Sequence, residues 1–360
     1  MFITFFFVHT TKIGDKIYWS STVYIIYAQC LGFIVNNLLA DLRVNKKIFV
    51  LNRSGEVFLF NDDGKFVRQI GAIGKGPGEY VGAQYMEVSP DGSLIYIYNQ
   101  RFGNAGYTYD LDGNQINSFK MNYLTWRFAP LSEGRHIMIS PYGSFSPDSA
   151  NFLFYLQDES GKVIRKYPSS QVIKMMGDFS IGGFFIDPIR VLAYQPFCDT
   201  VFQVDGEGNM NPVFNLNFGG HHAPDELYAD MANVMNPTET YFLSPTLRQT
   251  RDKLFIRIKE KQKYHIGIYR FDNGNIFSFK TDNGKIPNDL DGGPDFWPTG
   301  TDGDQELYQM VQPFDLLNPE KENQKNQLEV KNSDAAEAYQ RLLNTLTEND
   351  NPVVMVVKLK

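Results

Sequence analysis

The sequence predicts an all-β chain folded as a six-bladed β-propeller of four-stranded antiparallel blades, with a helical insertion in the last blade. Three observations support this fold class. One hairpin pattern recurs five times along the chain, short apolar strands lie upstream of each copy, and aromatic residues make up 14% of the 360 residues. Aromatic residues favour half-buried strands. Four strands in a period of about 48 residues are typical of a propeller blade.

The five repeated segments are interpreted as β-hairpins. In each, alternating apolar residues lead into an acidic or amide turn with a glycine, and the alternation then resumes. Asp-Gly, Ser-Gly and Asn-Gly supply the positive φ that tight hairpin turns need. The turn glycines are Gly64, Gly113, Gly161, Gly208 and Gly274. The first three steps between them are near-equal, at about 48 residues, and the fourth is longer.

Further strands are predicted upstream of the hairpins, at 46–52, 93–99, 135–140, 190–194 and 253–259. Six blades of this size fit into the chain better than seven. The sixth blade must come from both ends, because 306–314 and 351–360 are strand-like and 16–28 is a long alternating run. We therefore expect the N-terminal run to supply the missing strand of the last blade and to close the ring.

An insertion of about 316–350 separates the two C-terminal strands. Its first part is polar and charged and is predicted to be a solvated loop. In its second part Ser333 is a candidate N-cap, and apolar residues from Ala336 to Leu346 recur at helical spacing. We expect residues 16–360 to form a single propeller domain. Residues 1–15 are expected to be disordered or to be an incomplete leader.

The segment 69–82, QIGAIGKGPGEYVG, is the most motif-like stretch of the chain. It fails the phosphate-loop pattern, because Gly76 stands where Ser or Thr is needed to hold magnesium. We interpret it as the connection from the outermost strand of one blade to the innermost strand of the next, with Gly76 expected at an unusual φ. The alternative is that Lys75, Glu79 and Tyr80 belong to a ligand-binding surface.

A second candidate region is the Asp-rich segment 288–298. Trp297, beside Phe296, could stack on a sugar ring while Asp289, Asp291 and Asp295 accept hydrogen bonds from its hydroxyls. A strand-end aromatic residue is more often part of the core. The same carboxylates could bind calcium, but their spacing departs from the EF-hand pattern and turns are often rich in Asp. The predicted ligand-binding residues are therefore Lys75, Glu79, Tyr80, Asp289, Asp291, Asp295 and Trp297.

Composition excludes several classes of function. A net charge of −7 argues against binding to nucleic-acid backbones. The two cysteines, Cys30 and Cys198, are too few for a disulfide scaffold and match no metal-ligand spacing. No run is long enough to span a membrane. The adjacent His221 and His222 are weak metal candidates, since neighbouring side chains tend to diverge. We predict no cofactor, no metal and no catalytic motif.

The chain resembles the six-bladed β-propeller family of Bacteroides-type bacteria, related to NHL-repeat and TolB-like propellers. The residues that carry the resemblance are GKFVRQIGAIGKGPGEY, NDLDGGPDFWP and NPVVMVVKLK. The resemblance runs from about Cys30 onward and implies export to the cell envelope, although the chain shows no signal peptide. It assigns no biochemical activity.

Two classes of function follow. The favoured one is a non-enzymatic propeller, expected to be a monomer, that binds a glycan, a peptide or an envelope protein. The alternative is a lyase or hydrolase with its site in the central channel. Arg101, Trp126 and Arg127 lie near strand ends and could face that channel. Fold alone does not choose between the two classes.

Overall fold

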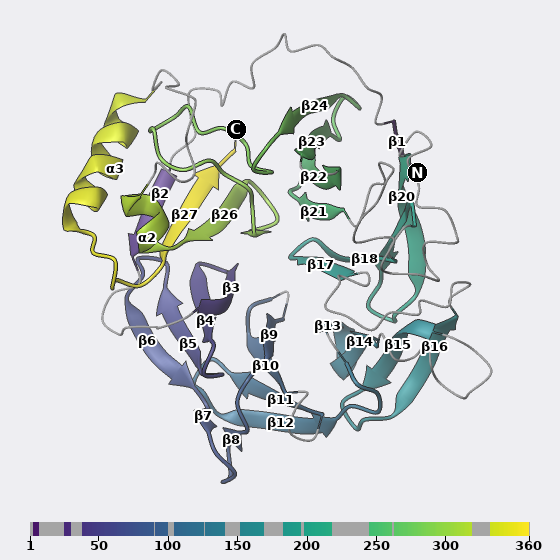
Figure 1. Cartoon of the computed structure of the whole chain (residues 1–360). Helices are drawn as coiled ribbons and strands as arrows, with labels where there is room; N and C mark the ends of the chain where they lie inside the picture. Colours follow the sequence, from purple (N-terminus) through teal and green to yellow (C-terminus); the bar gives the residue numbers. More distant parts are fainter. Residues whose placement is uncertain are drawn as a thin grey trace.

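The strands of the computed structural model form six antiparallel sheets arranged in a ring (Figure 1). The structure describes residues 3–6, 25–29, 38–89, 91–99, 104–125, 127–140, 152–168, 183–195, 198–217, 245–260, 263–318 and 332–359. Each sheet is one blade, and its four strands follow one another in sequence from the channel outward. Two blades depart from this order, because strands from near the start of the chain add to them. The predicted six-bladed propeller is therefore confirmed.

Blades 1 to 3 follow one another along the chain. Blade 1 consists of β3 (Leu38–Val44), β4 (Lys47–Asn52), β5 (Val57–Asn61) and β6 (Phe66–Ile70). A two-stranded ribbon, β7 (Ala72–Ile73) and β8 (Glu79–Tyr80), follows it. Blade 2 consists of β9 (Tyr85–Val88), β10 (Leu94–Asn99), β11 (Ala105–Asp110) and β12 (Gln115–Lys120). Blade 3 consists of β13 (Arg127–Pro130), β14 (Arg135–Ile139), β15 (Phe152–Asp158) and β16 (Val163–Pro168), with the 3-10 helix η1 (Ser132–Gly134).

Blades 4 to 6 complete the ring. Blade 4 consists of β17 (Gly183–Asp187), β18 (Arg190–Tyr194), β19 (Thr200–Val204) and β20 (Met210–Asn217), and β1 (Ile3–Phe6) adds to its outer edge in parallel. Blade 5 consists of β21 (Thr246–Gln249), β22 (Lys253–Glu260), β23 (Lys263–Arg270) and β24 (Ile276–Thr281). Blade 6 consists of β25 (Gly300–Thr301), β26 (Glu306–Val311), β27 (Val353–Lys358) and β2 (Ile25–Gln29).

Both chain ends build blade 6, as the sequence predicts. The strand β2 pairs antiparallel with β27, from Ile25 opposite Val357 to Gln29 opposite Val353. The predicted closing run is 16–28, and its part before Ile25 lies outside the described residues. Blade 6 is therefore completed by backbone hydrogen bonds between β2 and β27, two strands that lie far apart in the sequence.

The predicted hairpin turns occur between the third and fourth strands of blades 1 to 5. All five turn glycines have positive φ, between 73° and 85°. In four of these turns an Asn or Asp side chain, at position 61, 110, 158 or 205, accepts a hydrogen bond from the N–H four residues later. A short side-chain acceptor there satisfies a backbone donor inside the turn. This explains why an acid or amide stands three residues before the glycine in these four turns.

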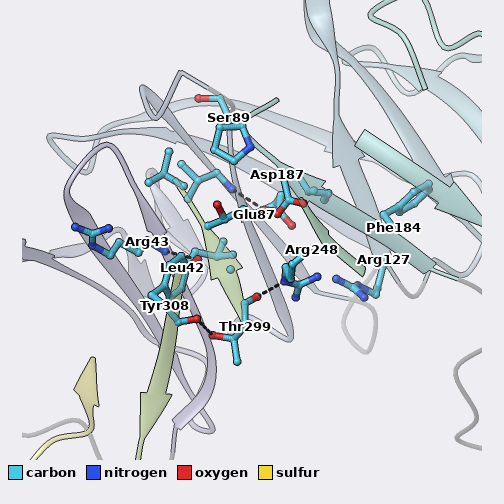
Figure 2. A pocket seen from close by; sticks show the side chains of 16 residues that line it. Leu42, Arg43, Glu87, Ser89, Arg127, Phe184, Asp187, Arg248, Thr299 and Tyr308 are labelled. Atoms are coloured by element: carbon cyan, nitrogen blue, oxygen red, sulfur yellow. Dashed lines mark hydrogen bonds between the residues drawn. The ribbon is translucent and has the colours of Figure 1, made fainter. Parts of the chain in front are cut away.

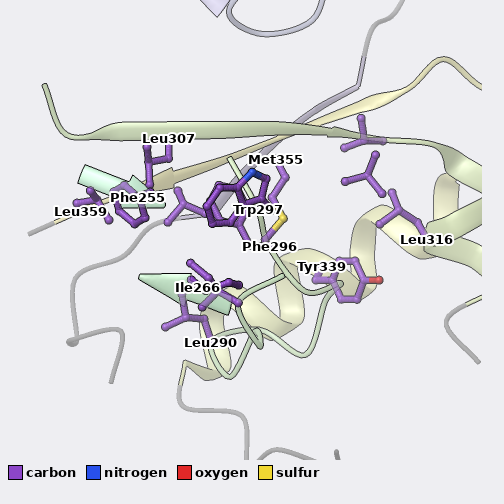
Figure 3. Close-up of a cluster of buried hydrophobic side chains, with 14 of the residues drawn as sticks. Phe255, Ile266, Leu290, Phe296, Trp297, Leu307, Leu316, Tyr339, Met355 and Leu359 are labelled. Carbon is purple, nitrogen blue, oxygen red and sulfur yellow. The ribbon is translucent and has the colours of Figure 1, made fainter. Parts of the chain in front are cut away.

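The insertion in blade 6 is helical, with one difference from the prediction. Helix α3 (Ser333–Thr345) begins after Asn332, whose side chain accepts a hydrogen bond from the N–H of Ala335 at 3.1 Å, so Asn332 and not Ser333 is the N-cap. A short helix α2 (Pro313–Leu317) was not predicted; it ends the strand-like run 306–314 at Val311. Tyr339 of α3 is buried in the cluster around Trp297 (Figure 3). None of the helices in the described ranges has the length and apolar character needed to span a membrane.

The antiparallel order of each blade defines two faces of the ring. The turn between the first and second strands of every blade lies on one face, which we call the inner-hairpin face (residues 45–46, 89–93, 131–134, 188–189, 250–252 and 302–305). The connections that lead from an outermost strand to the next innermost strand lie on the other, which we call the inter-blade face. Any site at the ends of the inner strands therefore opens to the inner-hairpin face.

Candidate functional site

A cavity of about 60 Å³ lies on the axis of the ring (Figure 2). All six blades contribute to its wall through their innermost strands or the residues next to them. Its polar wall residues include Arg43, Glu87, Arg127, Asp187, Arg248 and Thr301. A cavity walled by six inner strands is the central channel of the propeller, so it is the concave site that the fold itself creates.

The cavity reaches toward the inner-hairpin face. Val44 ends β3, while Ser89 and Pro188 directly follow β9 and β17, and all three line the cavity. Asp187 forms the last residue pair before its hairpin, opposite Arg190. Arg127 lies three residues before the last pair of its own hairpin. At about 3.3 Å per residue, Arg127 begins roughly 10 Å deeper than Asp187 along the channel.

Glu87 is held by Tyr85 on the same side of strand β9. The Tyr85 hydroxyl donates to Oε2 of Glu87 at 2.7 Å. The Arg127 guanidinium lies over the Tyr85 ring, 5.4 Å from its centre, and makes a long hydrogen bond of 3.5 Å to the hydroxyl. Burial raises the pKa of Glu87 to about 7, even though Tyr85, Arg127 and Arg248 act in the opposite direction. Glu87 is thus an acid that exchanges its proton near neutral pH.

Asp187 and Arg248 occupy the neighbouring part of the cavity. Asp187 is 3% exposed, and its Oδ2 accepts a hydrogen bond from the N–H of Gln249 at 3.0 Å. Burial raises the pKa of Asp187 to about 6, against the attraction of Arg248. The Arg248 guanidinium donates to the carbonyls of Thr299 and Leu247, at 2.7 and 2.8 Å. These carbonyl contacts fix Arg248 in the cavity wall.

Arg43 also lines the cavity, but it has a structural role. Its guanidinium forms ion pairs with Asp62 at 2.7 Å and with Glu306 at 2.8 Å. These contacts join blade 1 to blade 6, next to the point where the ring closes. Because both partners are carboxylates, Arg43 has little capacity left for an anionic ligand.

Arg127 and Arg248 differ from Arg43 in this respect. Among the described residues, neither forms an ion pair with a carboxylate; their hydrogen bonds go to a tyrosine hydroxyl and to backbone carbonyls. Arg127 is also exposed to the channel. Two arginines without carboxylate partners in one cavity can bind an anionic group. The described residues contain no cluster of three His, Cys, Asp or Glu side chains that could hold a metal.

The predicted loop residues Lys75, Glu79 and Tyr80 lie in the connection between blades 1 and 2. Lys75 is exposed, whereas Oε2 of Glu79 accepts a hydrogen bond from the N–H of Gly76 at 2.6 Å. Tyr80 is fully buried, and its hydroxyl accepts a hydrogen bond from the N–H of Val57 at 3.2 Å. The connection joins an outermost to an innermost strand, as predicted. Glu79 and Tyr80 stabilise this connection.

The Asp-rich segment lies between blades 5 and 6. Asp291 accepts hydrogen bonds from Asn288 and from the N–H of Gly293, and Asp295 accepts one from Asn283. Asp289 is half-buried. Trp297 is 4% exposed, and the Arg257 guanidinium lies 4.6 Å from the centre of its ring (Figure 3). Two of the carboxylates therefore support the loop, and the indole packs in the core.

These two predicted groups lie on the inter-blade face, away from the cavity mouth. Blades 6 and 1 separate them, and Figure 1 shows their connections at distant points of the ring. The structure does not bring them together into one site. A ligand-binding role for either group stays a prediction.

Glu87, Asp187 and Arg248 were missed by the sequence analysis. Their signal is a charge within a short strand that is otherwise largely apolar or uncharged: YMEV, GFFID and TLRQ. Of the residues expected near the channel, Arg127 lines it, while Arg101 and Trp126 lie outside the described residues. His221 and His222 also lie outside them.

Comparison with known proteins finds solved structures with a similar fold and one matching family model. A crystal structure of a Bacteroides fragilis protein described as exported matches with 18% identity, 100% coverage of both chains and a TM-score of 0.73. A member of the DUF4221 family from Bacteroides vulgatus matches with 11% identity, 94% coverage of this chain, 99% of the other and a TM-score of 0.52. At these identities the likeness establishes the fold alone. No curated relative was found. The family model of a domain of unknown function, DUF4934, matches residues 39–358, and the chain therefore belongs to that family.

Proposed function

We propose that the protein is a non-enzymatic ligand-binding propeller of the bacterial cell envelope, and that it holds the acidic end group of a glycan or peptide in its central cavity. The observation that carries this proposal is the pair Arg127 and Arg248. Both guanidiniums belong to the cavity wall, and neither forms a direct ion pair with a described carboxylate.

Arginine suits this role because its planar guanidinium can donate two parallel hydrogen bonds to one carboxylate. Burial in the channel strengthens such contacts, since less water screens the charges. The proton affinity of Glu87 adds to the effect: its pKa is about 7, so part of the protein carries a neutral Glu87 at neutral pH. A neutral Glu87 does not compete with the ligand for Arg127.

Two observations support a location in the envelope. The sequence resembles exported propellers of Bacteroides-type bacteria, and the matching Bacteroides fragilis protein is described as exported. Acidic glycans and peptides are both available as ligands in that compartment. Fractionation of the native host, followed by detection of the protein in the envelope fraction, tests this part of the proposal.

A binding screen with paired ligands tests the site. Acidic oligosaccharides and peptides are compared with their neutral counterparts on the wild type and on Arg127→Met and Arg248→Met. We expect the acidic ligands to bind the wild type and to lose at least tenfold in affinity with either variant. Arg165→Met is the matched control, because Arg165 is exposed on the outer strand β16.

The same screen separates the cavity from the predicted loops. Lys75→Ala and Trp297→Ala remove the cation and the aromatic ring of the inter-blade candidates. Acidic-ligand binding that disappears with either of these variants, but survives Arg127→Met, would place the site on the inter-blade face and reject the cavity.

One observation favours an enzyme as the second candidate. Glu87 has a pKa near 7 and receives a hydrogen bond from Tyr85, which is the arrangement of a general acid or base. On this alternative, glycan or peptide ligands are cleaved in the channel. Turnover by the wild type that is abolished in Glu87→Gln, while ligand affinity is retained, would establish it.

A further inference from the structure

Asp187 lines the cavity, and one of its two carboxylate oxygens has no hydrogen-bond partner among the described residues. Oδ1 is buried and forms no hydrogen bond with any described residue, whereas Oδ2 is used by Gln249. A buried carboxylate oxygen without a donor lowers stability, because it loses its water without replacement. An unmade interaction of this kind at a cavity is a feature of sites that await a ligand.

The nearby arginines form no hydrogen bond with this oxygen. Arg190, opposite Asp187 in the hairpin, donates to the side chains of Gln249 at 2.8 Å and Gln203 at 3.2 Å. Arg248 donates to backbone carbonyls. Glutamine and carbonyl acceptors thus hold both cations in place, and Asp187 lies in the cavity wall near Arg248 (Figure 2).

We infer that Asp187 binds the amino group of the ligand, so that the cavity selects a zwitterion with a free ammonium group beside its carboxylate. This inference rests on the proposed function, because Arg127 and Arg248 supply the carboxylate half of the site. An ammonium group donates three hydrogen bonds, and its positive charge complements the negative charge of Asp187. The ligand class is then a short peptide with both of its ends free.

The depth of the residues orients this ligand. Asp187 lies at the inner-hairpin mouth, and Arg127 begins roughly 10 Å further in. A bound zwitterion therefore has its amino group near the inner-hairpin end of the channel and its carboxylate further along the channel. The cavity of about 60 Å³ admits an end group and not a folded partner. A metal ion at Asp187 is disfavoured, since no cluster of three potential metal ligands occurs in the described ranges.

The experiment uses three dipeptide probes on the full chain: alanyl-alanine, its N-acetyl derivative and its C-terminal amide. Calorimetry on the wild type is expected to show that acetylation and amidation each weaken binding about tenfold or more. In Asp187→Asn, the free and acetylated dipeptides are expected to bind equally. In Arg127→Met, where only Arg248 remains to bind the carboxylate, the preference for the free dipeptide over its amide is expected to shrink. Asp112→Asn is the control, because Asp112 is 74% exposed and lies far from the channel wall in a turn of blade 2.

The outcomes separate the two proposals. Wild-type binding of the acetylated dipeptide at the same affinity as the free one overturns the zwitterion inference and leaves the acidic-group proposal intact. This comparison needs no variant, so a failure of Asp187→Asn to fold does not affect it. Failure of both carboxylate dipeptides to bind overturns this inference, and failure of the acidic oligosaccharides and peptides of the first screen as well overturns the proposed function.

Discussion

His136 is a fully buried histidine whose ring nitrogens both lack hydrogen-bond partners among the described residues. Its ring stacks on Phe119, with 4.8 Å between centres and 10° between planes. Burial lowers the pKa of His136 to about 4. The neutral ring is therefore packed in blade 3 as an aromatic group, and its protonation opposes folding.

This packing predicts acid sensitivity. The folded pKa lies below the ordinary value near 6.5, so the contribution of His136 is complete above pH 6.5 and is lost as pH falls toward 4. The loss is on the order of 3 kcal/mol. His136→Phe keeps the stacking and removes the titration. Urea unfolding at pH 4.5 and 7.5 should show a smaller pH effect in the variant; an equal pH effect in both proteins would contradict the assignment.

Glu87 has the opposite dependence on pH. Its folded pKa of about 7 lies above the ordinary value of 4.5, so stability falls as pH rises through this interval. Glu87→Gln is expected to be more stable than the wild type at pH 8, by on the order of 3 kcal/mol at most, and to lose this advantage at pH 4.5. Thermal unfolding across pH measures it, with the exposed Glu207→Gln as control. A constant difference at all pH values would exclude a role for ionisation.

The glycine loop corrects one expectation. Positive φ occurs at Gly71 and Gly78, at 61° and 78°, and not at Gly76. A Cβ at Gly71 would also lie 2.9 Å from the rings of Tyr109 and Tyr80. Gly71→Ala is therefore expected to lower the melting temperature by several degrees, while Gly76→Ala, which meets only the end of the Glu79 side chain, is tolerated. Similar melting temperatures for the two variants would refute this distinction.

At the scale of elements, the sequence predicts what local chemistry controls. The outer hairpins were found because Asp or Asn and glycine determine each turn within five residues. The sequence does not predict helix α2, because five residues carry too little helical periodicity. Pro313 indicates the start of a helix only once the end of β26 is known. The inner strands are short: β13 has four residues and β25 has two. Alternation over so few residues is a weak signal.

The candidate site could not be assembled from the sequence for a related reason. Glu87, Arg127, Asp187 and Arg248 come from four different blades, and only closure of the ring brings them to one axis. By contrast, the glycine-rich and Asp-rich segments look distinctive because their chemistry is local. In the structure much of that chemistry supports turns, as with Asp291 and Glu79.

At the scale of the molecule, closure of the ring depends on β2. Removal of residues 1–29 leaves β27 with one edge unpaired in blade 6 and withdraws five residue pairs. We expect the truncated protein to unfold cooperatively at a lower temperature and to aggregate through the exposed edge. Calorimetry of the truncated and full chains measures this. Removal of residues 1–6, which takes away only β1 from the edge of blade 4, is the comparison.

If the truncated protein melts at the temperature of the full chain, β2 does not contribute to closure. A smaller effect of the shorter truncation is expected, because blade 4 keeps its four strands without β1.

The pairing of β2 with β27 also imposes an order on biosynthesis. Residues 25–29 leave the ribosome long before their partner, Val353–Lys358. For most of synthesis the chain is an open arc, and the sixth wall of the cavity, with Thr301 and Tyr308, is incomplete. A prematurely terminated chain therefore has no finished cavity and shows free strand edges to proteases. The cavity is thus complete only in a molecule whose sixth blade has been made.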